Sequence, residues 1–249
     1  LNNIQVGSLA SNGNNIFAGT GSNGVYLTTN NGSNWIQTGL NGIQYIPSLI
    51  INGGNIFAGT SGSGVYTSSN NGMNWSQTAL NSGWIYALGN NGVEILAGSI
   101  GAGIQRTTNN GGSWQQAQLI NNNAVSFAGY GNNLFVSVQG TNFSNGVNLS
   151  TDGGASWSYT NFNAEAICSG GSNIFGAFNG ESRITRSTDN GVSWQQIGMN
   201  NAGGWISVIA SGSNVFASHY VMQRSTDGGV NWTILPGISS SLLKCLATN

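Results

Sequence analysis

Short apolar runs alternate with clusters of Gly, Asn and Ser along the whole chain, and no segment shows helical periodicity. Four such runs stand close together in one part of the sequence: Ile46–Ile51, Asn55–Thr60, Gly64–Ser69 and Asn74–Leu80. Apolar runs of about six residues, bounded by turn-forming residues, are typical of β-strands joined by tight turns. We therefore expect this segment to form a four-stranded antiparallel sheet.

One tryptophan marks each period of a repeat that runs through the chain, at intervals between 37 and 43 residues. The six copies are Trp35, Trp75, Trp114, Trp157, Trp194 and Trp232. Each copy closes a similar stretch of eight residues, called the octet below, such as Ser-Thr-Asp-Gly-Gly-Ala-Ser-Trp at 150–157. One motif repeated at a nearly constant period indicates a repeat architecture.

Six consecutive four-stranded sheets favour a radial arrangement, the β-propeller, because that architecture leaves only short, protected edges. We predict an all-β protein with a single β-propeller domain over 1–249, six four-stranded blades and one octet turn in every blade. The expected repeats are approximately 1–39, 40–79, 80–118, 119–160, 161–198 and 199–236, followed by a partial closing strand at 237–249. That last segment either completes a six-bladed ring or begins further repeats, so seven blades are the alternative.

The first two runs of each repeat carry the most regular apolar positions. The first run, predicted to be the innermost strand, has Leu9, Leu49, Leu88, Phe127, Ile167 or Ile209 at one position. The second run carries an apolar pair: Ile16-Phe17, Ile56-Phe57, Ile95-Leu96, Leu134-Phe135, Ile174-Phe175 or Val215-Phe216. Paired apolar residues in a short run are typical of a buried strand. We expect these pairs to pack blade against blade.

The octet is predicted to be a turn. Its third residue is Asn30, Asn70, Asn109, Asp152, Asp189 or Asp227. A side-chain oxygen there can accept a hydrogen bond from the backbone two residues on, which closes an Asx turn. The fifth residue is always glycine, which suits a positive φ, and the tryptophan then buries its ring beside the turn. Because three octets have Asn where three have Asp, we expect no metal ligand and no catalytic acid here.

The pattern Ser-x-Asp-x-Gly-x-x-Trp resembles the Asp-box, or BNR repeat, of sialidases and related propellers. All six octets are similar to it, three of them with Asn in place of Asp. The resemblance implies a propeller over the whole chain, with the octets on the face away from the active site of the sialidases. The phrases Phe-Ala-Gly-Thr, Gly-Val-Tyr and Asn-Asn-Gly-x-Asn-Trp are also similar to repeats of large secreted bacterial surface proteins.

Charged residues make up only 4% of the chain, with five Lys and Arg and a formal net charge of −1. Nucleic-acid binding depends on phosphate neutralisation by basic residues, and anionic membranes attract polybasic segments. We expect neither partner, and no apolar run approaches the ~20 residues that span a bilayer. The chain starts at Leu1 inside a repeat phrase, so we expect a removed export signal or an upstream region and an extracellular location.

The arginines do not form the triad that binds the substrate carboxylate of a sialidase. Arg106, Arg186 and Arg224 occupy one repeat position just before the octet. They are therefore expected on the third strands of separate blades, where they cannot converge on one pocket. The expectation is that the protein is not an enzyme.

Few other residues offer catalytic chemistry. Outside the octets the acids are Glu94, Glu165 and Glu181, and a glycosidase needs two carboxyls across a cleft. Glu165 and Glu181 share a repeat, so that one pair is conceivable. His219 is the only histidine, which excludes a zinc site built from several histidines. We expect no metal and no cofactor.

The candidate ligand site lies on the face opposite the octets. Four positions before the innermost-strand Leu, Ile or Phe stand the lead-in residues Gln5, Tyr45, Trp84, Asn123, Asn163 and Trp205. In a six-bladed ring they would surround the channel mouth, with Trp84 and Trp205 on opposite blades. The outer loops of that face add Glu181, His219 and Tyr220. Aromatic rings beside amides suit a neutral sugar, although such aromatics can equally plug the channel or cap the core.

The sequence thus favours a non-catalytic, secreted or cell-surface propeller module for adhesion or recognition. Its partner would be a neutral glycan or a protein, contacted on the channel face. The alternative is a purely structural subunit or cargo domain of a larger surface or secreted protein. A sialidase-like glycoside hydrolase relative is a further alternative, which the missing acids and arginines disfavour.

Overall fold

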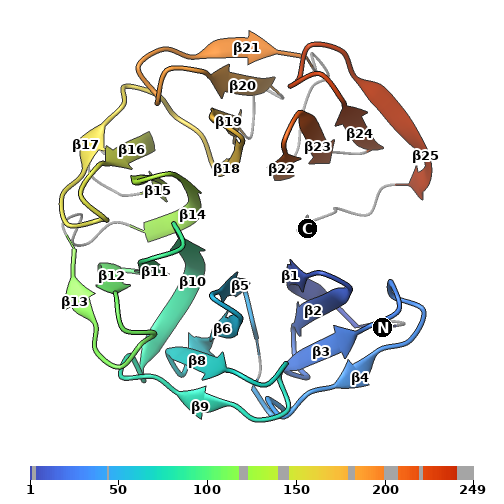
Figure 1. Cartoon of the computed structure of the whole chain (residues 1–249), viewed down its shortest axis with the longest axis vertical. Helices are drawn as coiled ribbons and strands as arrows, with labels where there is room; N and C mark the ends of the chain where they lie inside the picture. The colour runs from blue at the N-terminus through green and yellow to red at the C-terminus, as the bar shows by residue number, and fades with distance from the viewer. Residues whose placement is uncertain are drawn as a thin grey trace. The chain divides into compact units, whose positions relative to one another are not determined.

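The computed structural model describes residues 1, 4–43, 45–117, 123–139, 146–178, 183–198, 207–218 and 221–239. Within them the chain forms six sheets, and the fold is an all-β six-bladed β-propeller with four-stranded antiparallel blades, as predicted (Figure 1). Contacts within the chain group the blades into two units. Unit 1 covers Leu1–Ala124 and unit 2 starts at Val125.

Unit 1 contains blades 1 to 3, and in each blade strands that follow one another in sequence pair antiparallel. Blade 1 consists of β1 (Val6–Asn12), β2 (Asn15–Thr20), β3 (Val25–Thr28) and β4 (Ile36–Gln37). Blade 2 consists of β5 (Ser48–Asn52), β6 (Asn55–Gly59), β8 (Val65–Ser68) and β9 (Ser76–Gln77). Blade 3 consists of β10 (Gly83–Asn90), β11 (Ile95–Ser99), β12 (Gly103–Thr107) and β13 (Gln115–Gln116), and the short β7 (Ser61–Gly62) adds a fifth strand beside β10.

Unit 2 contains blades 4 to 6 with the same strand order, although β14 begins two residues before the unit does. Blade 4 consists of β14 (Asn123–Tyr130), β15 (Asn133–Gln139), β16 (Gly146–Ser150) and β17 (Ser158–Tyr159). Blade 5 consists of β18 (Ala166–Gly170), β19 (Asn173–Phe178), β20 (Arg183–Ser187) and β21 (Gln195–Ile197). Blade 6 consists of β22 (Ser207–Ser211), β23 (Asn214–Ser218), β24 (Val221–Ser225) and β25 (Thr233–Ser239).

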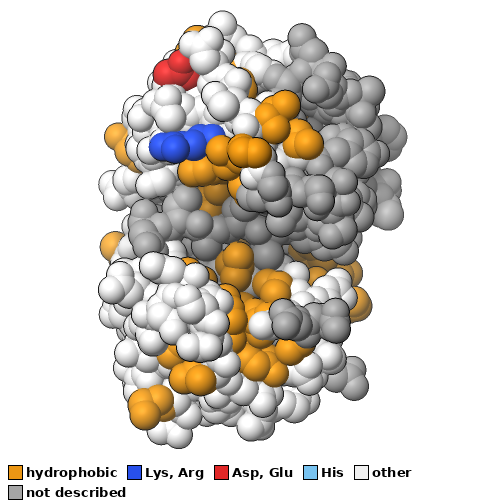
Figure 2. All heavy atoms as spheres, turned by 90° about the vertical axis from the view of Figure 1, so that its right-hand side faces the viewer, with side chains coloured by type: hydrophobic (Ala, Val, Ile, Leu, Met, Phe, Trp, Pro, Cys, Tyr) orange, Lys and Arg blue, Asp and Glu red, His pale blue; other side chains and the backbone are white. Residues whose placement is uncertain are grey.

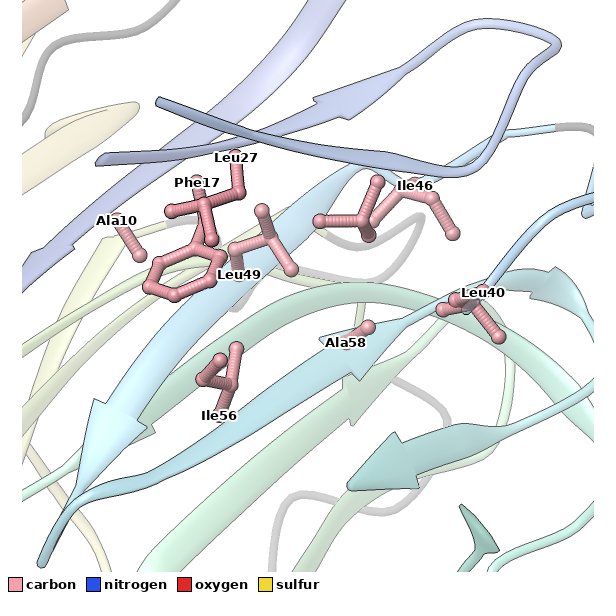
Figure 3. Packing of buried hydrophobic residues seen from close by; sticks show 9 residues of the cluster. Ala10, Phe17, Leu27, Leu40, Ile46, Leu49, Ile56 and Ala58 are labelled. Carbon is pink, nitrogen blue, oxygen red and sulfur yellow. The ribbon is translucent and has the colours of Figure 1, made fainter. Parts of the chain in front are cut away.

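The first strand of each blade lies innermost in its unit, as predicted. In unit 1, β5 contacts both β1 and β10, and in unit 2, β18 contacts β22. The second strands pack between blades, and ten of the twelve residues in the predicted apolar pairs are buried, while Ile16 and Phe216 are half-buried. Figure 3 shows the contact between blades 1 and 2, where Phe17 and Leu27 of one blade meet Leu49 and Ile56 of the other.

Except in blade 6, the outermost strands are shorter than predicted, with two or three residues each. In blade 2 the run Asn74–Leu80 contains only the strand β9, because the chain bulges after it. Both Thr78 and Leu80 pair with Val65: Thr78 N–H donates to Val65 O at 2.9 Å, and Val65 N–H donates to Leu80 O at 2.8 Å. Ala79, between them, donates instead to Gly111 O of the next blade at 3.0 Å. The backbone thus leaves its own sheet to bind the neighbouring octet.

The end of the last repeat also differs from the prediction. The strand β25 pairs with β24 as far as Ser239, which faces Val221. The first three residues of the predicted closing strand, 237–239, therefore belong to the outermost strand of blade 6. The remainder, 240–249, lies outside the described residues.

Each octet is a turn held by one hydroxyl and one side-chain oxygen. The residue at its first position is a Ser or Thr that is buried in every octet. Its hydroxyl donates to the side-chain oxygen at the third position at 2.7–3.0 Å. The same hydroxyl accepts the N–H of the fifth-position glycine at 2.8–3.1 Å. The third-position oxygen accepts the N–H four residues on at 2.9 Å, for example from Ser156 to Asp152. The predicted bond two residues on is therefore wrong, because that N–H belongs to the fifth-position glycine and donates to the first-position hydroxyl. The turn also contains two consecutive left-handed residues.

Those two residues are the fourth and fifth of the octet. The fifth-position glycines have φ between 80° and 92°, as predicted. The fourth position is left-handed as well, at Asn31, Asn71, Asn110, Gly153, Asn190 and Gly228. Asn and Gly are the residues that adopt this conformation at least cost. The alternation of Asn and Gly at this position is the sequence signal for it.

The octet also binds the preceding blade. Besides the bond from Ala79 to Gly111, Gly39 N–H donates to Gly72 O at 2.8 Å. The ring of Trp194 in blade 5 stacks on Phe162, which follows the outermost strand of blade 4, with centroids 4.0 Å apart. The octets of blades 2, 3 and 5 are thus contacts between neighbouring blades as well as turns within one.

The three aspartates of the octets predict an acid-sensitive stability. Hydrogen bonds lower the pKa of Asp152, Asp189 and Asp227 to about 2, chiefly from Ser156, Ser193 and the backbone N–H of Asn231 respectively. In the unfolded chain these carboxyls titrate near 3.9, so the unfolded state takes up protons first as the pH falls. Stability is therefore expected to decrease between about pH 4 and pH 2.

This expectation is tested by urea unfolding at pH 5 and pH 2.5. Changing the three aspartates to Asn should reduce the loss of stability at the lower pH, because Asn occupies the same position in blades 1 to 3. Asn30→Asp is the reverse variant and should increase that loss. Identical pH dependence in all three proteins would contradict the role of these carboxylates.

Candidate functional site

In a blade of antiparallel strands, the segment before the first strand and the loop between the second and third strands lie at the same end. This end is called the loop end below. The octet joins the third and fourth strands and lies at the opposite end. The lead-in residues that the structure describes therefore lie at the loop ends of their blades.

In unit 1 the loop ends are held from their outer side by a repeated glutamine. Two residues after the octet tryptophan, Gln37 Nε2 donates to Asn23 O at 2.8 Å and Gln77 Nε2 donates to Ser63 O at 2.8 Å. Gln116 bonds Ala102 O in the same way, at 3.2 Å. The acceptors lie in the loops between second and third strands, so the outermost strand fixes each loop in position. Sequence reasoning missed this role, although Gln recurs at that position.

Backbone contacts link three of the predicted site residues in unit 1. Tyr45 O accepts the N–H of Ser61 at 3.1 Å, and Ser61 in β7 pairs with Trp84 in β10. From Trp84 the connection continues through the next loop, where Ile100 N–H donates to Trp84 O at 3.3 Å. The neighbouring Gly101 N–H donates to Asn123 Oδ1 at 2.9 Å.

Trp84 presents an exposed ring from a backbone that is fixed on both sides. Its side chain is 45% exposed, while the next residue, Ile85, is fully buried and donates its N–H to Thr60 O at 2.9 Å. The ladder of β10 shifts register between Ile85 and Ala87, and Tyr86 stands 40% exposed beside this bulge. Ile100 is 45% exposed. Trp84, Tyr86 and Ile100 are called the Trp84 platform below.

The other two lead-in residues of unit 1 differ from Trp84. Gln5 is exposed, and its carbonyl accepts the N–H of Gly21 at 2.9 Å. Tyr45 is half-buried, because its ring lies against Gly7 of blade 1: a Cβ atom on that glycine would come within 2.8 Å of Tyr45 Cε2. Tyr45 therefore packs between blades 1 and 2 and offers less of its ring to a ligand.

In unit 2 the lead-in residue Asn163 lies at the rim of a hollow of about 450 Å³. Val138 and Gln139 at the end of β15, and Gly146 at the start of β16, form the blade 4 side. Ala164 and Glu165 of the next lead-in segment, with Phe178 at the end of β19, form the blade 5 side. The set is called the loop-end hollow below. Glu165, considered for a catalytic pair, thus lies at the loop end.

The remaining candidate residues, Trp205, Glu181, His219 and Tyr220, lie outside the described residues. The opposition of Trp84 and Trp205 across a channel and the pairing of Glu165 with Glu181 stay predictions. Sequence reasoning missed Tyr86 and Ile100. Their signal was the position of Tyr86 two residues after Trp84, which puts the two side chains on one face of a strand.

The arginines lie where the sequence predicts. Arg106, Arg186 and Arg224 belong to the third strands β12, β20 and β24 of three different blades. Arg106 Nη1 is 3.8 Å from Glu94 Oε1, and Arg186 Nη1 donates to Gly228 O in the octet of the next blade at 2.9 Å. In the described part of the chain, no three His, Cys, Asp or Glu side chains come together as metal ligands.

Charge is sparse on the surface as well. Figure 2 shows one face of the molecule, where basic and acidic side chains occupy only small patches among uncharged ones. No helix within the described ranges is long and apolar enough to cross a membrane. A ligand of the loop ends would therefore meet mainly amides, hydroxyls, aromatic rings and backbone groups.

Comparison with solved structures identifies proteins of similar fold. The GH74 xyloglucanase from Xanthomonas campestris matches 94% of this chain with 15% identity and a TM-score of 0.69. YCF48, in a structure bound to D1 peptide, matches 93% with 15% identity and a TM-score of 0.67. PorZ, a surface component of the type-IX secretion system of Porphyromonas gingivalis, matches 98% with 11% identity and a TM-score of 0.72.

These likenesses establish the fold, which hosts many unrelated functions. This chain spans 45% of the xyloglucanase and 34% of PorZ, but 81% of YCF48. No protein-family profile matches the chain, and no curated protein matches it by sequence. The chain is thus similar in structure to Asp-box-type propellers that include an enzyme, a peptide-bound protein and a secretion-system component.

Proposed function

We propose that this protein is a non-catalytic recognition module of the cell exterior that binds neutral glycans at the loop ends of its blades. The Trp84 platform carries the proposal. It combines three exposed apolar side chains, two of them aromatic, with a backbone that neighbouring strands fix on both sides. An aromatic face held in advance suits the C–H face of a sugar ring, since little freedom is lost on binding.

The surroundings of the platform fit an uncharged ligand. Asn123 and the loop at Gly101 lie next to Ile100, and an amide can both donate to and accept from sugar hydroxyls. With charged residues at 4% of the chain, binding should depend little on ionic strength. Among the structural relatives, the xyloglucanase by its name acts on a polysaccharide and PorZ is a surface component. These names support a glycan ligand and an extracellular location.

Trp84→Ala is expected to weaken retention of the protein on a neutral polysaccharide at least about tenfold. Loss of an aromatic stacking contact of about 1.4 kcal/mol gives that factor. The measurement is affinity electrophoresis and calorimetric titration with xyloglucan, mannan, soluble starch and arabinoxylan. The melting temperature should change little, because the Trp84 ring is 45% exposed.

Tyr130→Ala is the matched control. Tyr130 is 43% exposed and ends β14, at the octet end of blade 4. Its loss should leave polysaccharide retention unchanged. A glycan array on which the wild-type protein binds nothing would refute the proposal, and a peptide or protein ligand would then have to be sought. Equal losses in both variants would show that the aromatic contacts are not specific to the loop end.

A further inference from the structure

The loop-end hollow lies where the repeat pattern changes. In blades 1 to 3 the residue two positions after the octet tryptophan is a Gln that fixes the loop of its own blade. In blade 4 that position is Tyr159, and its hydroxyl donates to Oδ1 of Asn163 at 3.0 Å. Asn163 is exposed at the rim, so Tyr159 orients an amide toward solvent at the hollow.

The walls of the hollow are built by fixed backbone. On the blade 4 side, Val138 pairs with Gly146, and Val147 N–H donates to Phe162 O at 2.7 Å. On the blade 5 side, Glu165 N–H donates to Ala177 O at 2.8 Å. The Ser137 hydroxyl donates to Ala164 O and joins the two blades. The hollow therefore exists before any ligand binds, and its volume lies within the range of about 300–1,000 Å³ for small-molecule sites.

Gly146 leaves room for the Tyr159–Asn163 pair beside the hollow. A Cβ atom there would lie 2.6 Å from Asn163 Oδ1, 2.5 Å from Tyr159 Cε2 and 2.6 Å from Phe162 O. Any larger residue would push the Tyr159–Asn163 pair out of position. The floor is apolar, with Val138 and Ala164 buried, whereas Gln139, Asn163 and Glu165 bring polar groups to the rim.

Two charged residues of blade 5 lie close to Phe178 along the backbone ladder. Glu165 N–H donates to Ala177 O, next to Phe178, and Phe178 pairs with Arg183 on the following strand. The guanidinium carbon is 5.8 Å from the centre of the Phe178 ring. The hollow thus has a carboxylate in its lining and a guanidinium beside its aromatic residue, so neither an anion nor a cation is favoured.

We propose that the loop-end hollow binds one neutral sugar ring, with Glu165, Asn163 and Gln139 bonding its hydroxyls and Phe178 contacting its C–H face. A carboxylate and two amides supply several acceptors and donors at close spacing, which is what neighbouring ring hydroxyls require. The inference rests on the proposed glycan recognition and adds to it a second, separate site. One site lies in unit 1 and the other in unit 2, so the residues of the two sites can be substituted separately.

The test is titration with methyl glycosides of glucose, galactose, mannose, xylose and N-acetylglucosamine, followed by saturation-transfer NMR. At least one should bind to the wild type. Glu165→Gln and the exposed Asn163→Ala should each weaken that binding about tenfold with an unchanged fold, whereas Tyr130→Ala, at the octet end, should leave it unchanged. Glucuronate and glucosamine should bind more weakly than the neutral glycoside.

The outcomes separate the two proposals. Glycoside binding that survives both Glu165→Gln and Asn163→Ala overturns the hollow, as does tighter binding of either charged sugar. Absence of glycoside binding, together with Trp84-dependent retention on polysaccharide, overturns the hollow and leaves the proposed function in place. Absence of both overturns both.

Discussion

Gly24→Ala is expected to destabilise unit 1 by at least about 3 kcal/mol. Gly24 has a φ of 73°, which is unfavourable for alanine, and an added Cβ atom would lie 1.7 Å from the carbonyl oxygen of Leu40. That oxygen accepts the N–H of Val25 at 3.1 Å and thereby joins the third strand of blade 1 to the segment after its outermost strand. The clash is with backbone, so relief requires breaking this connection.

Gly13→Ala separates the two causes. Gly13 also has a positive φ, of 58°, but no atom would lie within 4 Å of an added Cβ. It should cost about 1 kcal/mol, the expense of the left-handed conformation alone. Urea unfolding followed by tryptophan fluorescence measures both variants. If they lose the same stability, the close approach to Leu40 contributes nothing.

Trp194→Ala is expected to cost about 3 kcal/mol, the lower end for truncating a packed aromatic, because Trp194 is only half-buried. The variant loses the stack on Phe162 and the bond from its indole N–H to Gly191 O at 3.2 Å. It also leaves a void beside the cluster that contains Phe135 and Val147. Blades 4 and 5 should therefore lose part of their mutual contact together with the turn.

The control for this substitution lies two residues away. Val192 is in the same octet but is 83% exposed, so Val192→Ala should change stability by no more than about 0.5 kcal/mol. Hydrogen exchange adds spatial detail. Amides of β16 and β20, on either side of the contact, should exchange faster in Trp194→Ala. If they keep their protection, the tryptophan stabilises only its own turn.

Much of the fold follows from local pattern, since the period of the octets and the apolar pairs of the second strands predict blades and their buried faces. What the pattern could not show depends on contacts between repeats. The short outermost strand is an example, because it ends where Ala79 bonds Gly111 of the next blade. No propensity within one repeat indicates such a bond.

The candidate site was predictable only in part. Position in the repeat correctly placed Trp84 and Asn163 at the loop ends of their blades. The hollow could not be predicted, because it depends on Tyr159, Asn163 and Gly146 meeting across separate segments. The change from Gln to Tyr159 was visible in the sequence. Its effect on the loop end could not be inferred there, because only the structure shows that Gln at this position binds the loop in blades 1 to 3.

The octets of blades 2, 3, 5 and 6 fit against the blade before them, and this fit has a consequence for how such a chain can grow. A Cβ atom on the octet glycine would meet Thr38 at Gly72, Thr78 at Gly111 and Thr160 at Gly191, but Ile197 at Gly229. The octets of blades 2, 3 and 5 therefore share one kind of partner, whereas the octet of blade 6 is matched to a different residue of its predecessor. A duplication that copies an outermost strand together with the following octet keeps its partners, whereas one cut between them must find new ones. The segment that is duplicated as one piece would then begin at an outermost strand and would not coincide with one blade of the fold.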